Sequence, residues 1–289
     1  MVRSNGLILL GAVIVSLLIA PFYRSVSAVE TPASASVSIP PADDGARTAL
    51  EKSPRHREWV KVPVPGSETG LSSFIVYPER KDKAPVVIVI MEIFGLSDWI
   101  RAVTDQLAAD GFIAIAPDLL SGRGPKGGGT DSFPSRDDVI KAVTALSSAE
   151  VATMLNAVAD YATRLPAATR KFATVGFCWG GGMSFSYATT QPELGAAVVY
   201  YGVSPPLGTL DKISAPVLGL YGEDDARVVS TVKPAEEKMK ELGKVYVAHI
   251  YKGAGHGFLR AQGERAGANL EASRQAWPAT IEFLKKYLE

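Results

Sequence analysis

Short runs of consecutive apolar residues recur along the chain and predict the strands of a buried sheet. The strongest runs cover residues 86–91, 112–116, 172–176, 196–201, 217–221 and 245–251. Strands that are apolar at every position are covered on both faces, which is typical of a parallel sheet. Two earlier runs, 58–62 and 72–77, have prolines and a glycine between them and predict an antiparallel pair joined by a turn.

The segments between the strongest runs carry helical periodicity. They span residues 99–110, 137–147, 149–164, 182–191, 233–242 and 272–287. This alternation predicts an α/β protein whose doubly wound, mostly parallel sheet of about eight strands has helices on both faces. Active sites of such sheets collect at the carboxyl ends of the strands. We therefore expect the chemistry to follow the apolar runs directly.

The first 28 residues have the pattern of a secretory signal peptide. Arg3 precedes an apolar run at 7–20, and small residues end the segment at 26–28. As a helix the run would be about 21 Å long, shorter than the ~30 Å hydrocarbon core of a bilayer. We expect an exported protein, periplasmic or secreted, with no stable membrane insertion after cleavage. The alternative is an anchor formed by an uncleaved signal, which Arg24 in the cleavage region favours.

Residues 29–57 are rich in Ala, Ser and Pro and predict a flexible spacer. One folded domain is expected from 58 to 289, beginning near Trp59, and the 47% hydrophobic composition suffices for one sizeable core. Because Lys+Arg 30 balance Asp+Glu 30, nothing in the net charge favours nucleic acid as a partner. We expect a monomer that acts on a small molecule.

Cysteine and histidine are scarce, which limits the possible chemistry. One cysteine excludes a disulfide within the chain and leaves too few thiols for a structural zinc site. The three histidines, His56, His249 and His256, are far apart and show no metal-binding spacing. We expect neither a metal nor another cofactor.

The single cysteine lies in a motif that favours a nucleophile. The string Gly176-Phe-Cys178-Trp-Gly180 follows a predicted strand and precedes a predicted helix, which is the context of a nucleophile elbow with cysteine in the serine position. The helix N-terminus also favours a thiolate. The alternative is a buried, inert cysteine in a glycine-rich turn.

A thiol of ordinary pKa is only a few per cent ionised at neutral pH and needs a base. In this type of fold the acid and then the histidine follow the nucleophile along the chain. Asp224 and Asp225 follow the run 217–221, and His256 lies between glycines after the run 245–251. His256 is therefore the candidate base, and either aspartate is a candidate acid.

Three strings together resemble the dienelactone hydrolases (carboxymethylenebutenolidases), which have the α/β-hydrolase fold. They are G-F-C-W-G-G, G-x-x-D-x-R-V and G-x-x-H-x-F, and the resemblance covers roughly residues 59–289. It implies Asp225 rather than Asp224 as the acid. It also points to Glu92 in the string M-E-I-F-G, as a carboxylate that accepts the Cys178 proton when substrate arrives. A glutamate that only orders its loop is the alternative.

The remaining site residues follow from the fold type and the resemblance. The backbone N–H groups of Ile93 and Trp179 are the expected oxyanion donors. The resemblance implies that Arg260 and Arg123 bind a substrate carboxylate, although Arg123 is displaced by about one position and a surface role is the alternative. Tyr201 falls where a pocket tyrosine is expected, with core packing as its alternative.

These residues favour a hydrolase that cleaves an ester or lactone through a Cys-His-Asp triad and a thioacyl-enzyme. Its small-molecule substrate would carry a carboxylate if the arginines act as the resemblance implies. A broader carboxylesterase or thioesterase with another pocket is the nearest alternative. From a different class, the alternatives are a non-catalytic exported binding protein and a thiol redox sensor.

Overall fold

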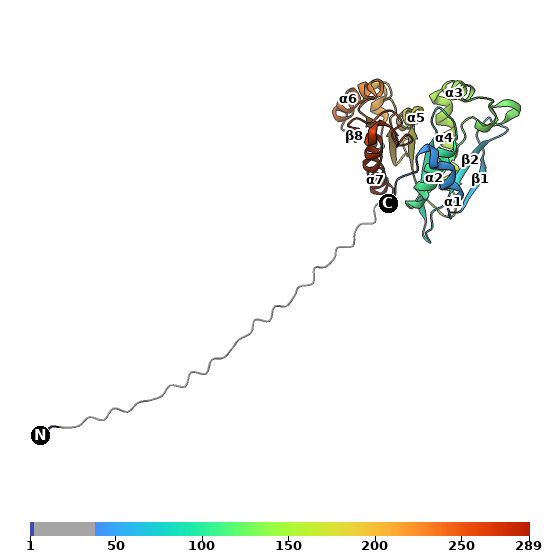
Figure 1. Ribbon diagram of the computed structural model, residues 1–289. Coiled ribbons are helices and arrows are strands. Elements are labelled where there is room, and N and C mark those ends of the chain that lie inside the picture. The colour runs from blue at the N-terminus through green and yellow to red at the C-terminus, as the bar shows by residue number, and fades with distance from the viewer. Residues whose placement is uncertain (3–37) are drawn as a thin grey trace. The chain divides into compact units, whose positions relative to one another are not determined.

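The computed structural model describes residues 1–2 and 38–289, and an eight-stranded mixed sheet forms the centre of the folded unit from residue 38 onward (Figure 1). The strands lie in the order β1-β2-β4-β3-β5-β6-β7-β8; β2 is antiparallel to β1 and β4, and the other pairs are parallel. Their bounds are β1 (Arg57–Val62), β2 (Leu71–Val76), β3 (Ala84–Ile90), β4 (Ile113–Pro117), β5 (Ala168–Phe177), β6 (Ala196–Tyr200), β7 (Val217–Gly222) and β8 (Tyr246–Tyr251).

Helices cover both faces of this sheet. Their bounds are α1 (Ala46–Lys52), α2 (Asp98–Ala109), α3 (Arg136–Thr144), α4 (Ser148–Thr163), α5 (Trp179–Ala188), α6 (Ala226–Glu241) and α7 (Ala268–Leu288). A hydrogen bond of 2.9 Å from Trp277 Nε1 in α7 to Asp110 Oδ2 connects α7 with the end of α2. On the other face α4 and α5 pack against each other and against β3 and β5. The predicted α/β architecture is confirmed.

The apolar runs predicted the central strands well, because the residues that are apolar in the sequence are the ones buried in the structure. Every residue of β3, β4, β6 and β7 is buried, as expected for central strands between two helical layers. The start of α6 differs from the prediction: the helix begins at Ala226, before the expected 233. Its first turns contain β-branched residues of low helix propensity, and burial of Val228 and Val232 stabilises them.

The predicted spacer of residues 29–57 extends too far into the chain. Residues 38–45, called here the N-terminal strap, end in a 3-10 turn at Asp43–Gly45 and lead directly into α1. Ala46 and Leu50 of α1 are buried, and α1 packs on α2. The folded domain therefore begins before Trp59. The Ala- and Pro-rich composition concealed a helix whose two buried apolar residues, four positions apart, share one face.

The N-terminal strap is attached by hydrogen bonds to its backbone. Trp99 Nε1 donates to Pro41 O at 3.1 Å, and Gln262 Nε2 donates to Pro40 O at 2.9 Å. The predicted signal peptide, except Met1 and Val2, lies outside the described residues. Within the described part of the chain, no single helix is long and apolar enough to cross a membrane; α3 and α4 together pass that test but are bent by 94°.

Candidate active site

Cys178 occupies the sharp turn between β5 and α5, with φ 55° and ψ −116°. A residue other than glycine at positive φ is strained and is held only where its surroundings require it. The neighbouring glycines are needed because the backbones are close: a Cβ on Gly176 would overlap the carbonyl of Gly180, and one on Gly180 would overlap that of Met91. The turn thus presents the sulfur at the carboxyl edge of the sheet.

Two hydrogen bonds connect Cys178, His256 and Asp225 in a line. Cys178 Sγ lies 3.0 Å from His256 Nε2, and His256 Nδ1 lies 2.5 Å from Asp225 Oδ2. Because a carboxylate accepts hydrogen bonds, Nδ1 carries a proton and Nε2 is left to accept a hydrogen bond from the Cys178 thiol. Asp225 follows β7 and precedes α6, and His256 lies in the loop after β8. The fold therefore brings three carboxyl-edge loops to one point.

The two adjacent aspartates have different surroundings. Asp225 is buried and contacts the imidazole. Asp224 is exposed and its Oδ2 pairs with Arg265 Nη1 at 2.5 Å. Only Asp225 can orient His256 in this arrangement.

The environment of Cys178 favours the neutral thiol. Burial, followed by the charge of Glu92, raises the pKa of the Cys178 thiol to about 11. The backbone N–H groups of Trp179 and Ile93, which point at the sulfur, and the cation of Arg227 act in the opposite direction. The same two N–H groups are positioned to hold an oxyanion formed beside the sulfur.

Glu92, directly after β3, is buried beside a cation. Its Oε2 lies 3.1 Å from Arg260 Nε. Neither atom has a hydrogen-bond partner among the described residues, so the N–H is not directed at the oxygen and the contact is an ion pair only. Burial raises the pKa of Glu92 to about 7, although Arg260 opposes this effect. Such a carboxyl group can both take up and release a proton near neutral pH.

A cavity of about 470 Å³ opens over the sulfur. Its walls are largely apolar, and they include Ile93, Trp179, Met183, Val203 and Pro205. Tyr201 also lines the cavity; its ring meets the His256 imidazole edge-to-face at 5.1 Å, and its buried hydroxyl has no partner among the described residues. The cavity is large enough for a small ester.

Arg227 lines the cavity although no role for it was predicted from the sequence. It lies in the first turn of α6, two residues after Asp225, and its side chain lines the cavity with Cys178 and His256. No ion pair to Arg227 occurs within residues 38–289. The sequence feature that could have indicated this role is the arginine of the G-x-x-D-x-R-V string, which lies two residues after Asp225.

The two arginines expected to bind a substrate carboxylate are placed differently. Arg260 lies beside Glu92 and does not line the cavity over Cys178. Arg123 Nη2 pairs with Glu150 Oε1 at 2.9 Å and lines a separate pocket with Thr153. The structure thus brings neither guanidinium into the cavity of Cys178.

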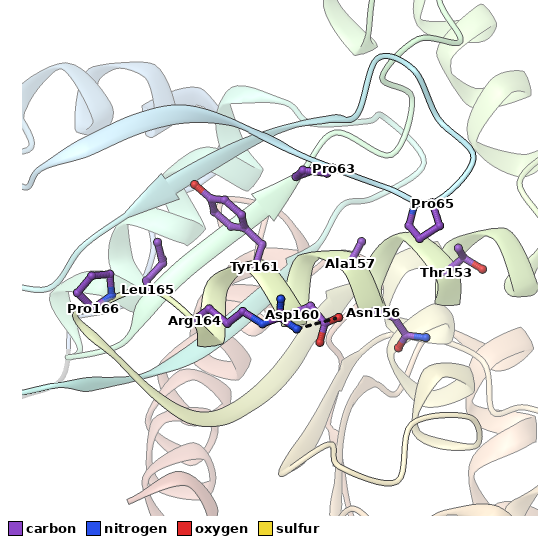
Figure 2. Close-up of a pocket in the computed structure, with 10 residues that line it drawn as sticks. All are labelled: Pro63, Pro65, Thr153, Asn156, Ala157, Asp160, Tyr161, Arg164, Leu165 and Pro166. Atoms are coloured by element: carbon purple, nitrogen blue, oxygen red, sulfur yellow. Dashed lines mark ion pairs between the residues drawn. The ribbon is translucent and has the colours of Figure 1, made fainter.

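A larger pocket of about 600 Å³ lies elsewhere, between α4 and the loop after β1 (Figure 2). Figure 2 shows Pro63 and Pro65 above the helix, whose Asp160 and Arg164 form an ion pair of 3.9 Å. The lining of this larger pocket contains no cysteine, serine or histidine. Among residues 1–2 and 38–289, no group of three His, Cys, Asp or Glu side chains could hold a metal ion. The chemistry of the smaller cavity identifies it as the candidate active site.

A mostly parallel sheet with a sharp strand–helix turn at Cys178, an aspartate after β7 and a histidine after β8 is the arrangement of an α/β-hydrolase. The profile of the Dienelactone hydrolase family matches residues 71–288. The protein belongs to the dienelactone hydrolase family, which confirms the resemblance found in its motifs.

Individual relatives agree with this assignment. A "Putative carboxymethylenebutenolidase" of Synechocystis sp. is 32% identical over 244 residues, covering 79% of this chain and 96% of the relative. A protein of the same name from Salmonella typhimurium is 30% identical over 237 residues, covering 78% and 86%. The crystal structure of a "Putative Dienelactone Hydrolase" from Klebsiella pneumoniae has a TM-score of 0.70 and 29% identity, covering 81% of this chain and 99% of the other.

Proposed function

We propose that this hydrolase cleaves an ester or lactone of a small molecule through a thioacyl-enzyme on Cys178. The observation that carries the proposal is the line of hydrogen bonds from Cys178 to His256 to Asp225, at 3.0 and 2.5 Å, at the base of a cavity of about 470 Å³. A nucleophile, a base and an orienting acid in hydrogen-bond contact are the arrangement that acyl transfer requires.

In the first half-reaction the thiol proton passes to Glu92 while His256 stays hydrogen-bonded to the sulfur. The sulfur attacks the carbonyl carbon, and the resulting oxyanion accepts hydrogen bonds from the N–H groups of Ile93 and Trp179. As the carbonyl reforms, the bond between carbon and the leaving oxygen breaks. The leaving group departs as an enol or alcohol after taking the proton from Glu92. A thioester on Cys178 remains.

In the second half-reaction His256 Nε2 takes a proton from water, and the hydroxide attacks the thioester carbon. Asp225 stabilises the imidazolium that forms. The carbon–sulfur bond breaks, the proton returns from His256 to the sulfur, and the carboxylic acid leaves. Together the two half-reactions consume one water and restore every group of the site.

The neutral resting thiol suits activated esters. Because burial and Glu92 raise the pKa of Cys178 to about 11, little thiolate exists before substrate binds. An acidic leaving group such as an enol lowers the barrier to breaking the carbon–oxygen bond after sulfur attack. An enol lactone or aryl ester is therefore the favoured substrate class over a simple alkyl ester.

Recognition of a substrate carboxylate falls to Arg227 in this proposal. Its guanidinium lines the cavity and has no ion pair with another described residue, whereas Arg260 and Arg123 are paired with Glu92 and Glu150. A carboxylate on the acyl group could contact Arg227 from within the cavity. This supports a carboxylate-bearing ester or lactone over a fully apolar one.

The test uses the full chain and the variants Cys178→Ala and Cys178→Ser. A panel of enol lactones and p-nitrophenyl esters is assayed, and the acyl-enzyme is trapped by rapid acid quench and intact mass spectrometry. We expect an adduct on the wild-type protein and none on Cys178→Ala. Full hydrolysis by Cys178→Ala would contradict the nucleophile assignment.

The same panel separates the alternatives. Equal turnover of alkyl esters and thioesters would identify a broader carboxylesterase or thioesterase. No turnover of any ester, with stoichiometric oxidation of the thiol by peroxide, would favour a redox sensor. We also propose that the protein acts outside the cytoplasm as a monomer; N-terminal sequencing of exported material and light scattering test those two points.

A further inference from the structure

The N-terminal strap reaches the loop that carries His256. The backbone N–H of Asp43 donates to Arg260 O at 3.0 Å, and Asp43 Oδ2 lies 3.3 Å from Arg260 Nη1. The bond from Gln262 Nε2 to Pro40 O holds the same loop to the strap two residues further on. The strap and the His256 loop are therefore tied together at three points.

The guanidinium of Arg260 forms ion pairs with two carboxylates where the strap meets this loop. Arg260 contacts Glu92 through Nε and Asp43 through Nη1. Its side chain is 24% exposed, while that of Glu92 is 3% exposed and that of Asp43 is 55% exposed. The Arg260 guanidinium also lies 5.2 Å from the centre of the Phe94 ring, which limits its movement on that side.

We propose that Asp43 is a positioning residue of the active site, which pairs with Arg260 and so shares the positive charge that lies beside Glu92. This inference rests on the proposed role of Glu92 as the acceptor of the thiol proton. Asp43 lies outside the segment 71–288 that matches the family profile, so the residue is a contribution of this chain's own N-terminal strap.

The physical reason is competition for one cation. A carboxylate paired alone with a guanidinium is a weak base, because the cation stabilises its ionised form. A second carboxylate on the same guanidinium reduces that stabilisation and leaves Glu92 more basic. The charge of Asp43 raises the pKa of Glu92, whereas Arg260 and Arg136 lower it. The charged and titratable groups that face Glu92 are Arg260, Asp43, Arg136, Cys178 and Tyr201.

The experiment compares Asp43→Asn with Asp44→Asn in the full chain. Asparagine retains the backbone bond to Arg260 and removes only the charge; Asp44 lies in the same turn and makes no ion pair with a described residue. The titration of Glu92 is followed by NMR of ¹³C-labelled glutamate carboxyl carbons, with the resonance assigned by its loss in Glu92→Gln. The pH profiles of kcat and KM for p-nitrophenyl acetate are measured in parallel.

In Asp43→Asn we expect the midpoint of Glu92 to fall by roughly half to one pH unit, the size of the effect of one partly exposed charge. The acidic limb of kcat should move in the same direction and kcat should drop roughly threefold, because Glu92 becomes a weaker base. KM should not change, because Asp43 does not line the cavity. Asp44→Asn should match the wild type, and Asp43→Glu, which keeps the charge, should retain the wild-type midpoint of Glu92.

An unchanged Glu92 midpoint in Asp43→Asn would overturn the inference, whether or not the melting temperature of the variant falls. The result is separable from the proposed function, because the NMR titration does not depend on turnover. If Cys178→Ala hydrolyses esters at the wild-type rate, the proposed function fails. If only the Glu92 titration is insensitive to Asp43, the positioning role alone fails.

Discussion

Two groups of side chains, one in the cavity of Cys178 and one beside it, are held in different ways. His256 and Asp225 form aligned hydrogen bonds, at 3.0 Å to the sulfur and 2.5 Å between each other. Glu92, Arg260 and Asp43 form ion pairs at 3.1 and 3.3 Å, and the contact of Glu92 lacks an aligned hydrogen bond. The imidazole of the first group is 35% exposed, while the carboxylate of Glu92 is buried.

The difference separates two tasks. Aligned bonds determine which imidazole nitrogen carries the proton and where it points, so small changes in geometry are costly. The ion pairs of Arg260 act mainly through charge, which determines how readily Glu92 exchanges a proton. This effect depends less on exact geometry than a hydrogen bond does. The first group should therefore respond to any change in its hydrogen bonding, and the second to removal of a charge.

His256→Ala should have the largest effect, because it removes the side chain that contacts the sulfur. We expect kcat/KM for an activated ester to fall roughly 1000-fold. His249→Ala, on the exposed face of β8, is the control and should retain wild-type rates. A loss below tenfold in His256→Ala would break the distinction between the two groups.

Asp225→Asn should lower kcat/KM roughly 100-fold, because an amide can hold the imidazole in the wrong tautomer. The adjacent Asp224→Asn should stay within about twofold of the wild type, because Asp224 pairs with Arg265 and not with His256. Steady-state kinetics on the two purified variants decide the matter. Reversed effects would assign the acid to Asp224.

Glu92→Gln should change how stability depends on pH. Between pH 4.5 and about 7 the folded wild type keeps a proton on Glu92 that the unfolded chain has lost, so Glu92 destabilises the fold increasingly as pH rises. A rise in the pKa of Glu92 from 4.5 to about 7 lowers the free energy of unfolding by about 3 kcal/mol at pH above 7.

Urea unfolding at several pH values measures this effect. The free energy of unfolding of Glu92→Gln should increase relative to the wild type across that window and then level off. Glu51→Gln, at an exposed position of α1, is the matched control and should show a constant difference. A pH-independent difference for Glu92→Gln would mean that the carboxyl group titrates normally.

Arg227→Met should have the smallest effect, because the guanidinium is exposed and screened. The ratio of kcat/KM for a p-nitrophenyl ester bearing an acyl carboxylate to that for a neutral ester of equal length should fall roughly fivefold. Arg274→Met, at an exposed position of α7, is the control. An unchanged ratio would show that Arg227 plays no part in recognition.

Most of the fold was predictable because its signals are local. Continuous apolar runs such as that of β3 are buried at every position, so the pattern identified central strands without knowledge of their neighbours. The glycines around Cys178 likewise indicated a turn whose backbones approach closely. The start of α6 was missed because burial of Val228 and Val232 outweighs their low helix propensity.

The arginines could not be assigned from spacing alone. Arg260 follows His256 by four residues, yet its guanidinium lies between Glu92 and Asp43, which are separated from it by more than 150 residues of chain. Arg227 reaches the cavity because α6 begins directly after Asp225. Which cation meets which anion depends on side-chain direction, which no single motif contains.

The sequence by itself determined the alternating sheet and helices, the elbow around Cys178, and the order of acid and histidine, because each depends on a few adjacent residues. Only the tertiary structure decided that residues 38–45 belong to the folded domain and that Asp43 shares Arg260 with Glu92. Those contacts join segments remote in the chain, and their energies come from burial and charge that exist only once the sheet has formed.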